Sequence, residues 1–302
     1  MKKLLVLFFV FAFHSVFSQE IKGIVRDHSS LKTIPYASVY YSKAEVCAYS
    51  DSTGNFSVPK IPGDTLVISV IGFEKFFVPV DNTINTIYVN LVPLTINLDE
   101  VEIKAKKYTD KKKGKILRLG NLSTKYDILI SGIKGRTVAY LVKNDAGVIG
   151  KIKSIQYGVN QMTKGFNVAD AMVRAHLYAV DETTGKPAED LMLNADVLKV
   201  RKEEKNLVVN VDHLDIELPL GGVYIGLEWM GEINERKGGN ISPWYAQSKT
   251  TKPTRVYVKF MDRGWQLAPT QKEQTTSPPK KGKNAVQGAY FEEPNFSVTV
   301  VY

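Results

Sequence analysis

Short strand-forming runs separated by turn residues constrain the fold of this chain more than any other feature. Between residues 20 and 103, β-branched and aromatic residues concentrate in runs such as 21–25, 37–41, 65–70 and 87–91. Gly, Pro, Asn, Asp and Ser separate these runs, and no stretch shows the three-to-four-residue spacing of an amphipathic helix. This pattern is typical of an antiparallel β-sandwich.

The second half of the chain has the same character. Runs at 173–180, 206–211, 223–230, 255–260 and 296–300 predict strands. In the first of these, Arg174, His176 and Tyr178 alternate with apolar residues, so the strand has one apolar and one polar face. Residues 168–177 also allow a helix capped by Asn167, but we prefer a strand that begins near Met172. The sequence therefore predicts an all-β protein with a second, jelly-roll-like antiparallel β-sandwich.

The N-terminus has the layout of a cleavable secretory signal. Lys2 and Lys3 precede an unbroken apolar run from Leu4 to Phe13, and cleavage is expected between Ser18 and Gln19. The run is shorter than the roughly 20 residues of a spanning helix; the alternative is a buried N-terminal helix. We therefore expect an exported protein that is periplasmic, associated with the outer membrane or displayed at the cell surface.

Positive charge is concentrated in one tract between the two halves. The formal net charge is +9. Residues 104–118 hold eight basic residues against Asp110, which is 8 − 1 = +7. The tract predicts a solvated, self-repelling linker, or alternatively a patch that meets anionic lipid headgroups or an acidic partner. Its clustering argues against nucleic-acid binding, which needs basic residues spread over a folded face. The basic residues are Lys104, Lys106, Lys107, Lys111, Lys112, Lys113, Lys115 and Arg118.

Three motifs in the first half form an ordered series. Gly-x-Val-x-Asp occupies 23–27, Pro-x-Ala-x-Val 35–39 and Asp-x-x-Gly-x-Phe 51–56, followed by runs at 64–73 and 98–103. Together they resemble the carboxypeptidase regulatory-like domain. The resemblance implies a transthyretin-like, seven-stranded, non-catalytic module that in Gram-negative envelope proteins commonly precedes surface domains.

The organisation expected from these features is a signal peptide at 1–18, the regulatory-like sandwich at 19–103, a basic linker at 104–118 and a second sandwich at 119–302. The C-terminal half resembles uncharacterised envelope β-sandwich domains, a resemblance that implies no activity. Cys47 is the sole cysteine, so an intramolecular disulfide is not expected. We interpret Cys47 as a small buried apolar residue.

Histidines and carboxylates offer one candidate metal site. His213, Asp215 and Glu217 alternate, so an extended segment would place them on one face. If that strand paired with the strand of His176, then His176, His213 and Asp215 would form an imidazole–carboxylate site. The alternative is a half-buried strand with Leu214, Ile216 and Leu218 packed inward. The His-x-x-Glu pattern of zinc carboxypeptidases is absent from the sequence, and no cofactor is predicted.

Aromatic residues offer a candidate binding surface. Trp244 and Tyr245 follow Ser242-Pro243 in a segment that reads as a loop, and Trp265 lies beside a strand. Exposed aromatic faces of this kind stack on sugar rings. The alternative is that Trp229 and Trp265 belong to the core.

These features predict a non-catalytic exported envelope protein that acts as an accessory or binding module. The partner would be a glycan, bound on a carbohydrate-binding-like fold, or an outer-membrane protein, with peripheral membrane contact through the lysines at 104–115. Two alternatives remain open: an assembly factor of an outer-membrane complex, and a hydrolase whose site has no recognised motif.

Overall fold

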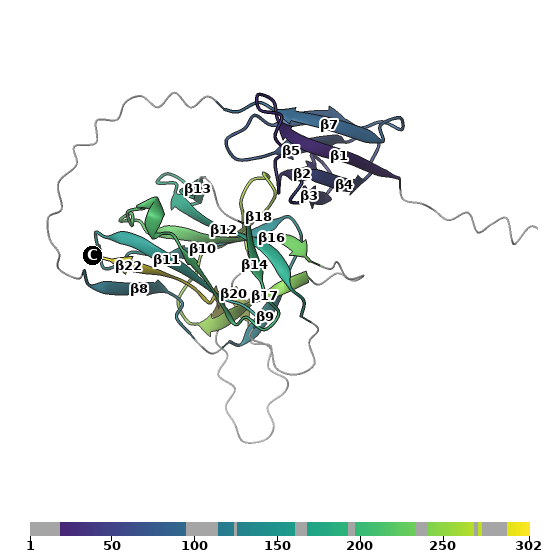
Figure 1. The fold of residues 1–302 in the computed structure, drawn as a ribbon. Coiled ribbons are helices and arrows are strands. Elements are labelled where there is room, and N and C mark those ends of the chain that lie inside the picture. The colour runs from purple at the N-terminus through teal and green to yellow at the C-terminus, as the bar shows by residue number, and fades with distance from the viewer. Residues whose placement is uncertain are drawn as a thin grey trace, which may run out of the picture. The chain divides into compact units, whose positions relative to one another are not determined.

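Almost every element of regular structure in this protein is a β-strand. The computed structural model describes residues 19–94, 114–123, 126–160, 168–192, 197–233, 241–268, 271–273 and 289–302. The expected signal peptide, with Ser18, and the basic residues at 104–113 lie outside these ranges. The chain divides into two compact units, Met1–Leu94 and Thr95–Tyr302 (Figure 1). The one helical element in the described ranges is a short 3-10 turn, so the all-β prediction is confirmed.

The first unit is a sandwich of two sheets. One has the strand order β4-β1-β7 and the other β3-β2-β5-β6, which together make the expected seven strands. The prediction of a purely antiparallel arrangement is wrong at one pair, because β1 and β7 run parallel. The strands are β1 (Glu20–Asp27), β2 (Ser38–Tyr41), β3 (Cys47–Tyr49), β4 (Asn55–Pro59), β5 (Thr65–Ser69), β6 (Phe76–Pro79) and β7 (Thr86–Leu91).

Alternating side chains build the core of this unit. In β7, Ile87, Val89 and Leu91 are buried while the residues between them are exposed. Gly23 lies directly opposite Phe56 of β4 in the same sheet, and a Cβ atom there would lie 2.4 Å from Cζ of the Phe56 ring. The first unit is thus held by apolar packing between its two sheets.

The second unit contains three sheets. The large sheet has the order β13-β12-β16-β10-β18-β19, with β14 also paired to β12; the smaller ones have the orders β15-β11-β22-β8 and β20-β21-β17-β9. The strands are β8 (Ile116–Gly120), β9 (Ile128–Gly132), β10 (Arg136–Val142), β11 (Lys151–Gly158), β12 (Ala171–Val180), β13 (Pro187–Asp190), β14 (Val197–Val200), β15 (Asn206–Asn210), β16 (Val223–Glu232), β17 (Ile241–Thr250), β18 (Val256–Phe260), β19 (Gln266–Leu267), β20 (Gln271–Glu273), β21 (Ala289–Pro294) and β22 (Phe296–Val301).

One continuous core joins the three sheets. Val173 of β12 and Ile225 of β16 pack in the same cluster as Ile155 of β11, Val298 of β22 and Tyr245 of β17. One face of the large sheet therefore covers the two smaller sheets, as in a β-sandwich. The strand interpretation of residues 172–180 is confirmed by β12.

The start of the second unit differs from the expected boundary. The linker was expected to run to residue 118, but Ile116–Gly120 forms β8 and pairs with β22, Ile116 lying opposite Val301. This strand was not predicted because the segment is rich in basic residues, although its Leu119 packs against the core. Within the described ranges, no helix has the length and hydropathy required to cross a membrane.

Candidate functional site

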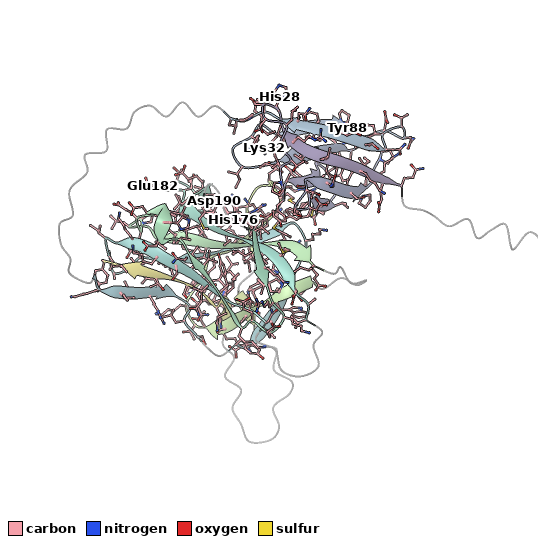
Figure 2. The ribbon with its side chains drawn as sticks, in the orientation of Figure 1. His28, Lys32, Tyr88, His176, Glu182 and Asp190 are labelled. Carbon is pink, nitrogen blue, oxygen red and sulfur yellow. The ribbon has the colours of Figure 1, made fainter. Side chains whose placement is uncertain are left out.

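A cluster of four ionisable side chains lies on the face of the large sheet opposite the main core. Arg174 and His176 come from β12, Asp190 from the end of β13 and Glu228 from β16. His176 Nδ1 lies 2.6 Å from Asp190 Oδ2, and its Nε2 lies 3.0 Å from Glu228 Oε2. Arg174 Nη1 donates to the same Glu228 oxygen at 3.1 Å. Figure 2 shows His176 and Asp190 side by side on neighbouring strands. We call these four residues the ion cluster.

Strand register brings the ion cluster together. Arg174 lies directly opposite Glu228, and His176 lies opposite Gly226. A Cβ atom at Gly226 would be 2.9 Å from Cβ of His176 and 2.7 Å from Cε2 of Tyr178. The missing side chain at Gly226 therefore leaves room for the His176 and Tyr178 rings, which stack with centroids 5.3 Å apart.

The protonation of His176 follows from its two partners. Neutral imidazole donates from one nitrogen only, whereas imidazolium donates from both, and both partners here are carboxylates. Burial alone would lower the pKa of His176, but the hydrogen bonds to Asp190 and Glu228 outweigh it and raise the pKa above its ordinary value of 6.5. When His176 is protonated, its imidazolium and the guanidinium of Arg174 balance the two carboxylates.

Asp190 is anchored independently of the imidazole. Its Oδ1 accepts from the backbone N–H groups of Leu177 at 3.3 Å and Met192 at 3.0 Å. The backbone holds Asp190, and Glu228 also accepts from Arg174. Both ring nitrogens of His176 therefore face carboxylates that have a second partner. The two contacts of His176 tie β13, β12 and β16 together.

Aromatic rings continue the ion cluster along the same face. Trp265 meets Tyr178 edge-on at 5.1 Å, and Lys259 Nζ lies 4.5 Å from the centre of the Trp265 ring. Burial raises the pKa of Tyr178 well above its ordinary value of 10.0. Trp265, predicted as a ligand-stacking residue, is half-buried in this contact.

The structure does not assemble the predicted metal site. Asp212–Leu214 is a 3-10 turn, and Asp215 has a φ of 54°, so His213 and Asp215 do not lie on an extended strand. The strands paired with the His176 strand are β13, β14 and β16. Among the described residues, no group of three His, Cys, Asp or Glu side chains is placed to hold a metal ion. The inward packing of Leu214, Ile216 and Leu218 is confirmed.

The structure also differs from the predicted aromatic binding surface. Trp244 and Tyr245 belong to β17 rather than to a loop. Tyr245 is buried between Trp229 and Phe296, at centroid distances of 5.4 and 5.7 Å. Trp244 is half-buried, and its backbone pairs with Asn160. Tyr245 therefore has no exposed ring face that could stack on a sugar. Trp229 belongs to the core, as the alternative interpretation predicted.

Sequence reasoning missed Asp190 and Glu228. A signal for Glu228 was present, because a carboxylate inside the apolar run 223–230 requires a buried partner. Asp190 gave no comparable signal, since it lies at the end of a short polar strand.

Comparison with known proteins bears on the first unit. Residues 21–103 match the family model of the CarboxypepD_reg-like domain. No curated protein matches the chain. Among solved structures, a Bacteroides fragilis NCTC 9343 protein of unknown function, described as membrane-associated, is 13% identical over 93% of this chain and 96% of that chain, with a TM-score of 0.20. A likeness at that TM-score supports no conclusion about fold or function. The family match and the seven-stranded sandwich agree, and the N-terminal unit of this chain is a carboxypeptidase regulatory-like domain.

Proposed function

We propose that this chain is an exported, non-catalytic protein of the cell envelope that acts as an accessory or binding module. The observation that carries the proposal is the match of residues 21–103 to the carboxypeptidase regulatory-like domain, whose described strands β1 to β7 form a seven-stranded sandwich of their own. The resemblance to this family implies a non-catalytic module that commonly precedes surface domains. In this chain the unit that follows it is a second β-sandwich.

The ion cluster supports a non-catalytic second unit. A general base must present an unshared lone pair within hydrogen-bonding distance of its substrate. His176 has carboxylate oxygens at both ring nitrogens, and its side chain is 8% exposed. The cluster is therefore suited to holding three strands together rather than to proton transfer.

The basic tract supports attachment to the envelope. Residues 104–113 hold six lysines and Asp110, which is 6 − 1 = +5. Juxtamembrane lysines are each worth about 1 kcal/mol at an anionic lipid surface. The burial of Tyr245 and the packing of Trp265 weaken the case for a glycan platform, so the partner we favour is the membrane or a protein in it.

Fractionation of cells that produce the full chain tests this proposal. The mature protein is expected to begin at Gln19 and to sediment with membranes. Replacing the six lysines at 104–113 by Gln should move it toward the soluble periplasmic fraction, whereas replacement by Arg, the matched control, should not. A chain that retains Met1 and stays in the cytoplasm would contradict the proposal.

A further inference from the structure

Strand β7 is an unprotected edge strand of the first unit. It pairs with β1 on one side and is the last strand of its sheet, as Figure 1 shows. Its residues Thr86–Leu91 are all uncharged and include no Pro or Gly. The other edge strands of this unit are short or end in proline, since β3 has three residues, β4 ends at Pro59 and β6 ends at Pro79. Because such features normally protect an edge from pairing, β7 is the edge of this unit at which another strand can add.

The hydrogen bonds at both ends of β7 fix which of its backbone groups face outward. The N–H of Lys22 donates to the carbonyl of Asn85 at 3.0 Å. The N–H of His28 donates to the carbonyl of Leu91 at 2.8 Å. Odd-numbered residues of β7 therefore face β1, and the even-numbered residues between them face away. The outward groups belong to Thr86, Tyr88 and Asn90. Among the described residues they have no hydrogen-bonding partner, and we call them the open edge of β7.

The chain itself pairs with the continuation of this edge. The N–H of Glu74 donates to the carbonyl of Val92 at 2.8 Å. The N–H of Leu94 donates to the carbonyl of Gly72, also at 2.8 Å. Val92 and Leu94 are even-numbered, so residues 72–74 lie on the outward side. An extended segment therefore fits beside this edge, and the stretch left unpaired runs from residue 86 to residue 90.

Two cations share the outer face of the sheet with an exposed aromatic ring. Ile21 and Val25 of β1 are fully buried, so the side chains of Lys22 and Arg26 point to the opposite, outer face. Tyr88 lies on the same face and is 70% exposed. Within the described part of the chain, neither Lys22 nor Arg26 makes an ion pair. The face beside the open edge is therefore positive and uncompensated.

We propose that the open edge of β7 binds an extended segment of a partner protein that carries two acidic side chains four residues apart. The inference rests on the proposed role as a binding module and names the chemistry of the partner. In such strand addition, backbone hydrogen bonds supply affinity and alternate side chains supply selectivity.

The register sets the spacing of the acidic residues. Lys22 lies opposite Thr86, and Arg26 lies opposite Asn90. Residues four apart in a strand lie about 13 Å apart on one face. Acidic side chains at positions i and i+4 of the added strand would lie in the same two rows, across the short Thr86 and Asn90 side chains. Position i+2 would lie beside Tyr88.

Charge argues against a second copy of this chain as the occupant. Two β7 strands paired edge to edge would place Lys22 and Arg26 of both copies on one face, and β7 has no acidic residue to separate them. The acidic side chain of β1 on that face is Glu20, which accepts from Ser57 Oγ at 2.7 Å toward β4, on the far side of the sheet. Like charges across a sheet are unfavourable, whereas an acidic strand is complementary.

Fluorescence anisotropy with labelled peptides tests the inference on the chain from Gln19. The probe is Ser-Glu-Val-Thr-Val-Glu-Ser, and its matched control, Ser-Val-Glu-Thr-Glu-Val-Ser, has the same composition with the acids two residues apart. The probe should bind about threefold tighter or more. Hydrogen exchange followed by NMR should show that the probe slows the amides of Thr86, Tyr88 and Asn90 and leaves those of β6 unchanged.

Reversing the two cations provides the decisive variant. Lys22→Glu/Arg26→Glu should weaken probe binding about tenfold and should create binding of Ser-Lys-Val-Thr-Val-Lys-Ser, a gain that a misfolded variant would not show. Lys143→Glu/Lys252→Glu, which replaces two exposed lysines of the second unit, is the control for net charge and should change binding less than twofold. Circular dichroism melting establishes that both variants are folded.

Two outcomes would overturn the inference. One is equal binding of the probe and its rearranged control, or no binding of either. The other is a chain that self-associates and thereby slows exchange of the same three amides, which would assign the edge to a second copy. Both are measured on purified protein, so they leave the proposed envelope function intact. A chain that retains Met1 in the cytoplasm would instead count against that function.

Discussion

Replacing Glu228 by Gln removes one charge from the ion cluster while keeping the shape of the side chain. Glu228 is 8% exposed, and it faces Arg174, which is 14% exposed, and His176, which is 8% exposed. The substitution leaves two buried cations with Asp190 as their remaining carboxylate in the cluster. Each charge-assisted hydrogen bond is worth about 1.5–3 kcal/mol, and the Gln carbonyl replaces part of this, so we expect a loss of about 3 kcal/mol.

Urea unfolding followed by Trp fluorescence measures this loss. The three Trp residues, at 229, 244 and 265, all lie in the second unit, so the signal reports that unit alone. With a denaturant slope of about 2–3 kcal/mol per molar, the midpoint should fall by about 1–1.5 M.

Asp215→Asn is the matched control, because it also removes a carboxylate from an ion pair. Its partner is Lys151, and the two side chains are 71% and 42% exposed. Surface pairs of this kind contribute about 0–1 kcal/mol, so the midpoint should barely move. A shift for Glu228→Gln no larger than that of the control would refute the stabilising role of the ion cluster.

Three further predictions follow from the same structure. Because its carboxylate partners raise the pKa of His176 above 6.5, the stabilisation that His176 contributes to the second unit should be fully present below about pH 6.5 and should fall by up to about 1.4 kcal/mol per pH unit as pH rises through the folded-state pKa; the difference in urea midpoint between the unaltered chain and His176→Gln across pH measures this contribution. Gly132→Ala should destabilise the second unit by about 2 kcal/mol or more, because its Cβ atom would lie 1.9 Å from Trp229, whereas Gly221→Ala, with nothing within 4 Å, should cost well under about 1 kcal/mol in the same assay. Trypsin should cut first within residues 104–113 and release two stable fragments, visible by mass spectrometry; a chain that resists cleavage there would contradict the linker interpretation.

Alternation along single strands allowed much of the fold to be predicted. The polar face of β12, with Arg174, His176 and Tyr178, followed from a period of two. The partners of that face did not, because they depend on which strands pair and in what register. A bulge between Met172 and Val173 shifts the pairing of β12 with β16, and this shift sets Arg174 opposite Glu228. The register between strands that lie far apart in the sequence cannot be predicted from the residue pattern within one strand.

The alternation of polar and apolar residues at 213–217 predicted an extended strand, and this prediction is wrong. The apolar members pack inward as a strand would require, but Asp215 adopts a left-handed conformation with a φ of 54°. A 3-10 turn and a short strand can bury the same apolar residues, so the pattern alone did not distinguish them. The parallel pairing of β1 with β7 was missed for a related reason, since β7 alternates buried and exposed residues as an antiparallel strand does.

The claim that the ion cluster is structural rather than catalytic is tested most directly by nitrogen NMR of histidine labelled with 15N. The chain from Gln19 contains His28, His176 and His213, and a His176→Gln variant assigns the signal. The account predicts that at pH 6.5 the ring of His176 is mostly protonated at both nitrogens and that added Zn²⁺ leaves their shifts unchanged. A neutral ring that titrates near 6.5, or a shift on adding Zn²⁺, would contradict it.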